Sequence, residues 1–264
     1  MQLDGTAKIG SDGHLNIGGV DCISLVEKYS TPLFVYDEEL IRKQCRRFHS
    51  ILENSGLDYH ISYASKAFIC KYLLKIMSEE NMGLDVVSAG ELYNAIAADF
   101  DPKKIHFHGN NKTEDEILMA LNENIGCFVI DSFDEIERLN TLAKKMSKTP
   151  NCLLRVTPGV EAHTHDFITT GNTYSKFCLN IDNGQAFDAI EKILGKDNLN
   201  LLGVHFHIGS QIFGTEGTRA AIEKVFAWFS KIKAELNFTP SVLNIGGGFG
   251  IRYTEEDISY PIET

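Results

Sequence analysis

Leu202-Gly203-Val204-His205-Phe206-His207 alternates bulky apolar residues with small or polar ones at every second position. Side chains of a β-strand point to opposite faces in turn, so one face of this segment is apolar and the other carries two imidazoles. Ile105–Gly109 repeats the pattern, because Ile105 and Phe107 alternate with His106 and His108. These segments are interpreted as strands whose apolar faces meet helices and whose polar faces converge.

Short β-rich runs alternate with longer helical patterns along most of the chain, which is typical of repeated βα units and a parallel sheet. Many such units without a long interruption favour a TIM-type barrel, an α/β fold whose chemistry lies at the C-terminal ends of its strands. The predicted strands are Leu33–Tyr36, Ile61–Ala67, Leu84–Ser88, Ile105–Gly109, Cys127–Asp131, Leu153–Thr157, Leu202–His207 and Val242–Gly246. The predicted helices include Asp37–Leu52, Thr113–Glu123, Ser132–Met146, Asn183–Leu194 and Thr215–Leu236.

Composition indicates a globular protein with an acidic surface. The 264 residues are 43% hydrophobic, and the formal net charge is −11. Without a Lys/Arg block, this charge argues against nucleic acid as a partner. The N-terminus lacks the pattern of a secretory signal, and no apolar run is long enough to span a bilayer. The six cysteines form no CxxC pair, which favours reduced thiols and a cytoplasmic location.

Lys66 and the glycine run Gly246–Gly248 together indicate an aldehyde cofactor that carries a phosphate. Lys66 ends an apolar strand and shares a face with the small residues Ser62 and Ala64. A lysine held where water is scarce is a nucleophilic amine able to form a Schiff base. Consecutive glycines allow backbone N–H groups to surround a phosphate. Pyridoxal 5′-phosphate (PLP) has both the aldehyde and the phosphate, although Lys66 alone also fits a surface lysine.

His207 is followed directly by Gly209-Ser210-Gln211, which supplies a hydroxyl and backbone donors beside the imidazole. This grouping suits an aromatic ring stacked on His207 with its phosphate near Ser210. A buried histidine with a purely structural role is the alternative for His207.

Three HxH pairs keep a metal-dependent amidohydrolase open as a different class of function: His106/His108, His163/His165 and His205/His207. On a barrel strand, such a pair directs both imidazoles inward and binds Zn²⁺. This hypothesis leaves Lys66 and the glycine run unexplained. It also lacks a well-placed aspartate, because Asp85 is expected at the start of its strand. We therefore predict no metal.

The chain resembles the diaminopimelate decarboxylases over nearly its whole length. The resemblance rests on Thr31–Asp37, Tyr63–Ala67, Gly83–Ser88, His108–Lys112, His205–Gln211 and Gly246–Gly250, which occur in the family's order. It implies a fold-type III PLP barrel followed by a β domain. By motif, it makes Lys66 the Schiff-base lysine and His207 the imidazole stacked on the cofactor. Further cofactor-binding residues implied in this way are Asp85, Arg155, Ser210, Gly246, Gly247 and Gly248.

The resemblance also extends to a substrate loop that contains Glu161, His163 and His165. It implies decarboxylation of meso-2,6-diaminopimelate to L-lysine and CO₂, the last step of lysine biosynthesis, by a homodimer. The loop favours diaminopimelate over ornithine or arginine as the substrate. A PLP-binding barrel without decarboxylase activity remains the alternative. The motif departs slightly at Cys178, where the family usually has a glycine.

The same resemblance predicts that the chain is an N-terminal fragment. The family continues to a Glu-Pro-Gly-Arg segment on the last barrel strand and then to the β domain, whereas this chain ends at Pro261–Thr264. We expect residues 1–36 to belong with the β domain, and residues 37–264 to form the barrel without its last strand. Because residues of the site are missing, impaired activity of the fragment alone is expected.

Overall fold

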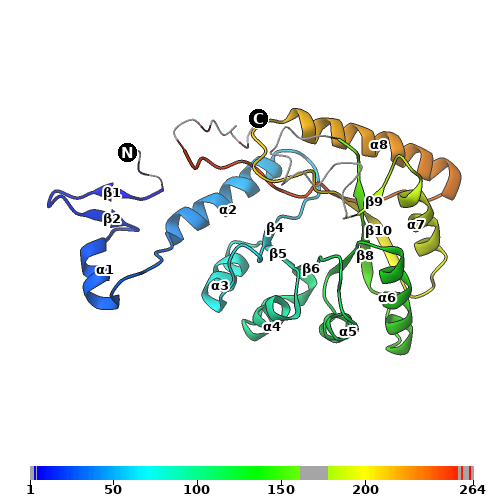
Figure 1. Ribbon diagram of the computed structural model, residues 1–264, viewed down its shortest axis with the longest axis horizontal. Coiled ribbons are helices and arrows are strands. Elements are labelled where there is room, and N and C mark those ends of the chain that lie inside the picture. Colours follow the sequence, from blue (N-terminus) through cyan, green and yellow to red (C-terminus); the bar gives the residue numbers. More distant parts are fainter. Residues whose placement is uncertain (1–2, 4, 161–177, 255–256, 258–261, 263–264) are drawn as a thin grey trace. The chain divides into compact units, whose positions relative to one another are not determined.

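The computed structural model describes residues 3, 5–160, 178–254, 257 and 262. Its main feature is a curved parallel sheet (Figure 1) in which strands follow one another in chain order, β4-β5-β6-β7-β8-β10-β11. The strands are β4 (Ser62–Ala64), β5 (Gly83–Val86), β6 (Ile105–Phe107), β7 (Cys127–Ile130), β8 (Asn151–Thr157), β10 (Asn200–His205) and β11 (Val242–Asn244). The short strand β9 (Leu179–Asn180) pairs with the end of β8.

Helices follow most strands, as the βα pattern predicts. They are α3 (Lys71–Glu79), α4 (Ala89–Ala97), α5 (Glu114–Glu123), α6 (Phe133–Lys145), α7 (Gln185–Leu194) and α8 (Glu216–Leu236), with a 3₁₀ turn η1 (Pro102–Lys104) before β6. Helices α4 to α7 lie along the convex side of the sheet (Figure 1). The described strands leave the sheet open, with β4 and β11 at its two edges.

The two faces of the sheet separate as the period-two pattern predicts. The apolar outward set is almost fully buried, with exposed fractions of 0–1%: Leu84, Val86, Ile105, Phe107, Ile130, Leu154, Val156 and Val204. On the inner face, Ala64, Asp85 and His106 are aligned across β4, β5 and β6. Arg155, His205 and Asn244 are aligned in the same way across β8, β10 and β11. Burial of the outward set holds the sheet against its helices and leaves the polar set on the inner face.

Two predicted helix starts are confirmed. Asp37 caps the N-terminus of α2 (Glu38–Glu53) by accepting the Leu40 N–H at 3.0 Å. Thr113 and Glu116 form a complete capping box at the start of α5. Each cap satisfies backbone N–H groups that have no partner within the helix.

The predicted strand at residues 33–36 is wrong. The structure gives these residues no regular secondary structure, and Phe34 is 91% exposed. An apolar run becomes a strand only where a neighbouring strand pairs with it, and the structure gives this segment no strand pairing.

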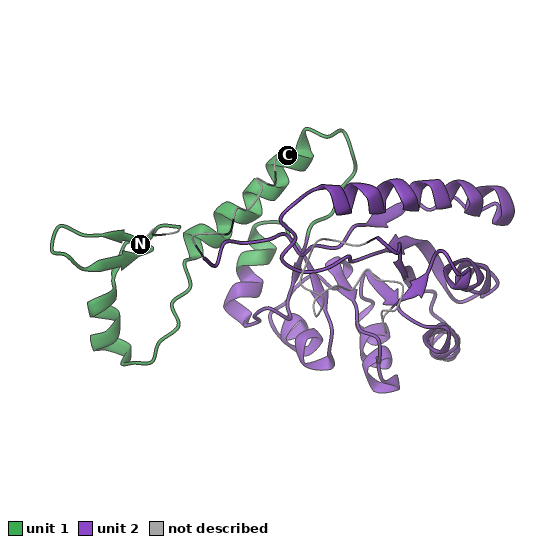
Figure 2. Cartoon of the chain, turned by 45° about the horizontal axis from the view of Figure 1, so that its top comes forward, with its two compact units in different colours: residues 1–61, 76–82 green, residues 62–75, 83–264 purple. Residues whose placement is uncertain are grey.

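The chain divides into two compact units (Figure 2). Unit 1 comprises residues 1–61 and 76–82, and unit 2 comprises residues 62–75 and 83–264. Unit 1 contains a three-stranded sheet, β1 (Lys8–Ile9), β2 (Leu15–Ile17) and β3 (Val20–Asp21), followed by α1 (Cys22–Tyr29) and α2. The parallel sheet belongs to unit 2. The expected boundary at residue 36 stays a prediction.

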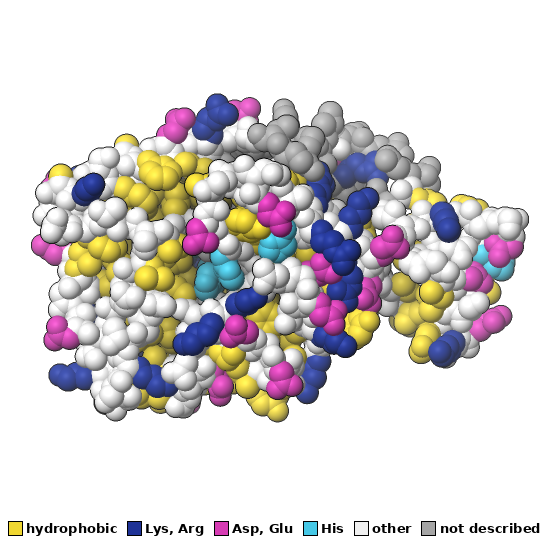
Figure 3. Space-filling model, turned by 180° about the vertical axis from the view of Figure 1, so that it is seen from behind, with side chains coloured by type: hydrophobic (Ala, Val, Ile, Leu, Met, Phe, Trp, Pro, Cys, Tyr) yellow, Lys and Arg dark blue, Asp and Glu magenta, His cyan; other side chains and the backbone are white. Residues whose placement is uncertain are grey.

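All six cysteines are free thiols in the structure. Cys45, Cys127 and Cys152 are buried, and the other three are half-buried. On the face shown in Figure 3, Lys and Arg side chains are interspersed with Asp and Glu. Among the described residues, every helix is too short or too polar to cross a bilayer.

Candidate functional site

Lys66 lies two residues beyond the end of β4, where the backbone is fixed by its neighbour Ser65. The Ser65 N–H and hydroxyl both donate to the carbonyl of Asp85, at 3.0 and 2.7 Å. Ser65 is 1% exposed and also contacts the Glu91 carboxylate, at 2.7 Å from Oγ to Oε2. Glu91 stands in the first turn of α4, where Ser88 caps the helix. The turn that carries Lys66 is therefore held by β5 and α4.

The Lys66 side chain is exposed, contrary to the expectation of a water-poor setting. The cause is the position of β4, which is an edge strand of the open sheet and has only β5 beside it. The small neighbour Ala64 is also exposed. The lysine amine is thus accessible from the inner face.

His207 and the glycine run lie against each other, although His207 and Gly247 are 40 positions apart in the chain. The Gly247 N–H points to His207 Nδ1 at 3.4 Å. The loop after β10 and the loop after β11 are joined by two backbone hydrogen bonds, Ile212 N–H to Gly248 O and Gly250 N–H to Ile212 O, both 2.9 Å. The imidazole, the exposed Ser210 and the glycines are therefore carried by two adjacent loops.

The three glycines differ in what surrounds them. A Cβ on Gly246 would lie 2.6 Å from the carbonyl of Phe206, and one on Gly248 would lie 2.0 Å from the carbonyl of Gly209. Both also have positive φ, +70° and +94°, which favours glycine. A Cβ on Gly247 would meet nothing within 4 Å. Gly246 and Gly248 are thus needed for the packing of the loops, whereas Gly247 faces open space.

The ionisable side chains on the inner face lie close enough to shift one another's pKa values. Burial and, to a smaller extent, the nearby positive charges of Arg155 and Lys66 together lower the pKa of His207 to about 4. Burial and the neighbouring charged groups likewise hold the pKa of His205 well below its usual range. His205 packs edge-on against His108, with ring centroids 4.9 Å apart. At neutral pH, His207 is therefore a neutral imidazole.

Asp85, His106 and His108 form a compact cluster on β5 and at the end of β6. Asp85 Oδ1 lies 3.7 Å from His106 Nδ1, and Asp85 Oδ2 lies 3.4 Å from His108 Nε2. Burial would raise the pKa of Asp85, but the two imidazoles and Ser62 outweigh it and lower the pKa overall. The expectation that Asp85 starts its strand is wrong, since β5 begins at Gly83 and Asp85 is its third residue. Its actual register brings it beside His106.

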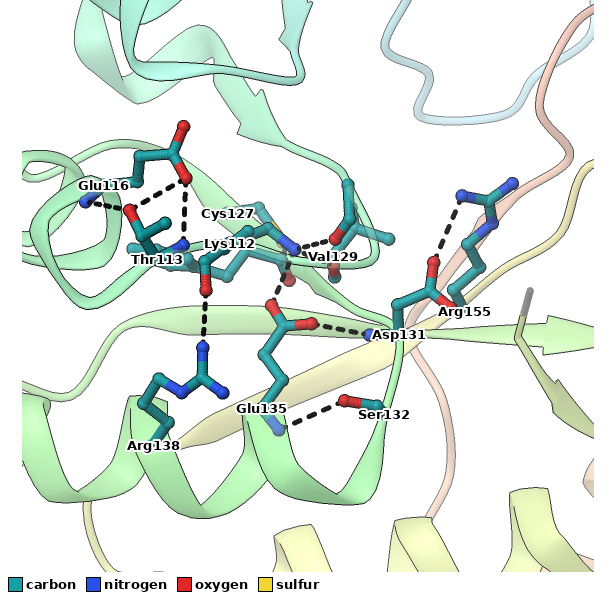
Figure 4. Close-up of polar contacts among 12 residues, drawn as sticks. Lys112, Thr113, Glu116, Cys127, Val129, Asp131, Ser132, Glu135, Arg138 and Arg155 are labelled. Carbon is teal, nitrogen blue, oxygen red and sulfur yellow. Dashed lines mark hydrogen bonds and ion pairs between the residues drawn. The ribbon is translucent and has the colours of Figure 1, made fainter. Parts of the chain in front are cut away.

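A buried ion pair that the sequence analysis missed supports the middle of the sheet (Figure 4). Lys112 Nζ donates to Glu135 Oε1 at 2.6 Å and to the carbonyls of Gly109 and Val129, both at 2.8 Å. Glu135 Oε2 accepts the Asp131 N–H at 3.0 Å. Burial raises the pKa of Glu135, and Lys112 partly offsets this. The position of Asp131 directly after β7 was the signal that the sequence offered.

Arg155 points to Asp131 (Figure 4), with Nη1 3.2 Å from Asp131 Oδ2. The structure therefore brings Lys66, Asp85, Arg155, His207 and the glycine run to one inner face. The substrate-loop residues Glu161, His163 and His165 lie outside the described residues, so their predicted role stays a prediction.

Comparison with known proteins decides the family. The family model for the pyridoxal-binding domain of pyridoxal-dependent decarboxylases matches residues 38–264. The chain belongs to the pyridoxal-dependent decarboxylases. Among the relatives of the chain, the diaminopimelate decarboxylase of Bacillus subtilis is 51% identical over 97% of the chain, and that of Staphylococcus aureus is 50% identical over 98%. The chain spans 58% and 60% of their respective lengths.

Solved structures agree on the fold. The diaminopimelate decarboxylase of M. jannaschii matches 96% of the chain with a TM-score of 0.88 and 36% identity, and the chain covers 59% of that structure. A second structure of that protein, in complex with L-lysine, has a TM-score of 0.86. The predicted α/β fold is confirmed as that of TIM-type decarboxylases, here with seven parallel strands in the main path of the described sheet.

Membership assigns PLP as the cofactor, and the residues present fit it. Asp85 Oδ1 and His108 Nε2 are buried and lie at ion-pair distance from neighbours in their cluster, but they complete no hydrogen bond among the described residues, so the inner face retains polar atoms with hydrogen-bonding capacity for a ligand. The open space at Gly247 leaves room for an anion at the glycine loop. The accessible amine of Lys66 completes the set.

Proposed function

We propose that the protein takes part in the PLP-dependent decarboxylation of meso-2,6-diaminopimelate to L-lysine and CO₂. The observation that carries the proposal is the convergence of Lys66, neutral His207 and the glycine loop on one face of the sheet. The names of the relatives at about 50% identity support diaminopimelate as the substrate. A small-molecule substrate, a homodimer and a cytoplasmic location belong to the same proposal.

Each residue has a role that follows from its position. Lys66 provides the amine that holds the cofactor, and His207 provides a neutral ring surface. Gly246–Gly248 and Ser210 bind the phosphate through backbone and hydroxyl donors, as loops at strand ends do in many phosphate sites. Asp85 provides a negative charge on the inner face, and Arg155 provides a positive charge there. When bound, PLP supplies the electron sink for the carbanion left by loss of the α-carboxylate.

The proposal is tested by following cofactor binding and product release separately. PLP titrated into the protein is expected to give a visible absorbance band that borohydride fixes to the peptide containing Lys66. CO₂ release is then measured with meso-diaminopimelate, L-ornithine and L-arginine. Release from ornithine or arginine alone would overturn the substrate assignment. Binding without release from any of the three would favour a PLP-binding barrel without decarboxylase activity.

Gly247→Val tests the phosphate cradle. A Cβ at Gly247 would meet nothing within 4 Å, so we expect the loop to accommodate a valine and the fold to persist. We expect weaker PLP binding through loss of charge-assisted hydrogen bonds, each worth about 1.5–3 kcal/mol. Binding of pyridoxal, which lacks the phosphate, should change less. The control is Gly195→Ala at the end of α7, where a Cβ makes only ordinary contacts. Equal effects of Gly247→Val on PLP and pyridoxal would contradict the cradle.

The Asp85–His106–His108 cluster keeps a metal-dependent hydrolase as a second candidate function. One ligand atom from each residue lies within 4.8 Å of the others, and two imidazoles with one carboxylate are a common ligand set for transition metals. A hydrolytic activity that chelators abolish and PLP never restores would favour this candidate over the decarboxylase.

A further inference from the structure

Asp131 is a buried carboxylate at the centre of the site's supporting contacts. It directly follows β7 and is 5% exposed. One carboxylate oxygen, Oδ2, lies 3.2 Å from Arg155 Nη1, and the other, Oδ1, accepts the Cys178 N–H at 2.8 Å. A single side chain thus joins a charged group of the inner face to the backbone just before β9.

The backbone of Asp131 is itself held in place. Its N–H donates to Glu135 Oε2, and the other oxygen of Glu135 is paired with Lys112 (Figure 4). Lys112 also donates to Val129, two residues before Asp131. The Asp131 N–H and both carboxylate oxygens thus have partners, and these contacts hold the carboxylate in one position relative to Arg155.

The position of the Arg155 guanidinium affects the neighbouring histidines. Arg155 is aligned with His205 across β8 and β10, and its charge helps to lower the pKa of both His205 and His207. Arginine has a long side chain with many rotamers, and an ion pair with a buried carboxylate reduces that freedom. Asp131 therefore determines where this positive charge lies on the inner face.

The contact with Cys178 is also informative. Cys178 has φ of +74°, a conformation that residues other than glycine adopt at a cost. The hydrogen bond from its N–H to Asp131 offsets part of that cost. Burial raises the pKa of the Cys178 thiol to about 11, so at neutral pH the side chain is a neutral thiol. The contact of Cys178 with Asp131 is made by its backbone N–H.

We propose that Asp131 is a positioning residue that acts through Arg155 by fixing the guanidinium on the face that binds PLP. The proposal rests on the proposed function. It adds a residue that has no direct part in the cofactor site described above.

The test is a double-substitution cycle on PLP affinity, measured by visible absorbance titration, with Asp131→Asn, Arg155→Gln and the combination. Asparagine has the same shape and keeps an oxygen for the Cys178 N–H, but it cannot pair with the guanidinium. Asp131→Asn is expected to weaken PLP binding about tenfold, the equivalent of losing one charge-assisted hydrogen bond. In the Arg155→Gln background it should have no further effect, because residues that act through one another are not additive.

The matched control is Asp134→Asn, an exposed aspartate paired with Arg138 on α6, which should leave PLP affinity unchanged. If Asp131→Asn does not fold, Asp131→Glu replaces it in the cycle, since it keeps the charge but displaces it. Additive effects of the two substitutions, or unchanged affinity in the Asp131 variant, would overturn the inference while the proposed function stands. Failure of the unsubstituted protein to bind PLP would overturn both.

Discussion

Lys66→Ala is expected to abolish covalent fixation of PLP by borohydride. The amine of Lys66 is accessible at the end of β4, on the face that also carries His207 and the glycine loop. Lys112 also follows a strand, but its ammonium donates to one carboxylate and two carbonyls, which occupies its three N–H groups. Of these two lysines, Lys66 is therefore the one whose amine is available to an aldehyde on the inner face.

The measurement is peptide mapping after reduction, together with the visible absorbance of the bound cofactor. Lys71→Ala is the control, because Lys71 is an exposed residue at the start of the nearby helix α3. We expect the control to retain full labelling. Weak, reversible PLP binding by the Lys66 variant fits the prediction, since the phosphate loop is intact. Labelling of a peptide that lacks residue 66 would contradict the assignment.

Lys112→Met is expected to have the largest effect on stability. The substitution leaves the Glu135 carboxylate buried without its cation, and removal of one partner from a buried ion pair costs about 3–5 kcal/mol. The measurement is the free energy of unfolding in urea, compared with Lys145→Met, which removes an exposed lysine from α6. The control should change stability by less than about 0.5 kcal/mol.

The pH dependence gives a second check on this variant. Burial already raises the pKa of Glu135 above 4.5, and loss of Lys112 should raise it further. A carboxyl group with a raised pKa in the folded state costs nothing below its unfolded pKa, where both states are protonated. The stability deficit should therefore be smallest near pH 4 and grow as the pH rises. A deficit that does not depend on pH would contradict an unpaired carboxylate as its cause.

Much of the sheet could be predicted from the sequence because its strands carry a local signal. All seven strands of the parallel path lie within or overlap predicted runs, and His106, Arg155 and His205 occupy the predicted inner face. Period-two alternation is a property of neighbouring residues, so it does not require knowledge of the fold. The segment 33–36 has the same apolar composition but no strand pairing, which composition alone does not reveal.

Part of the candidate site could be proposed from the sequence for the same reason. Lys66, His207 and the glycine run are visible as strand-end motifs, whereas Asp131 and Glu135 act through contacts that join separate βα units. The short sheet β1-β2-β3 has strands of two or three residues, too few for a periodic pattern. The role of Cys178 depends on its backbone angle, which only the structure supplies.

The order of strands in the sheet has a consequence for how the site is assembled during synthesis. In the seven-stranded path from β4 to β11, neighbouring strands of the sheet follow one another along the chain. Pairing of this kind closes only short segments of chain, so the sheet can grow one unit at a time as the polypeptide leaves the ribosome. Lys66 is placed with the first strand, and the glycine loop is placed with β11. These two parts of the candidate site therefore come together only when the unit that carries β11 has docked.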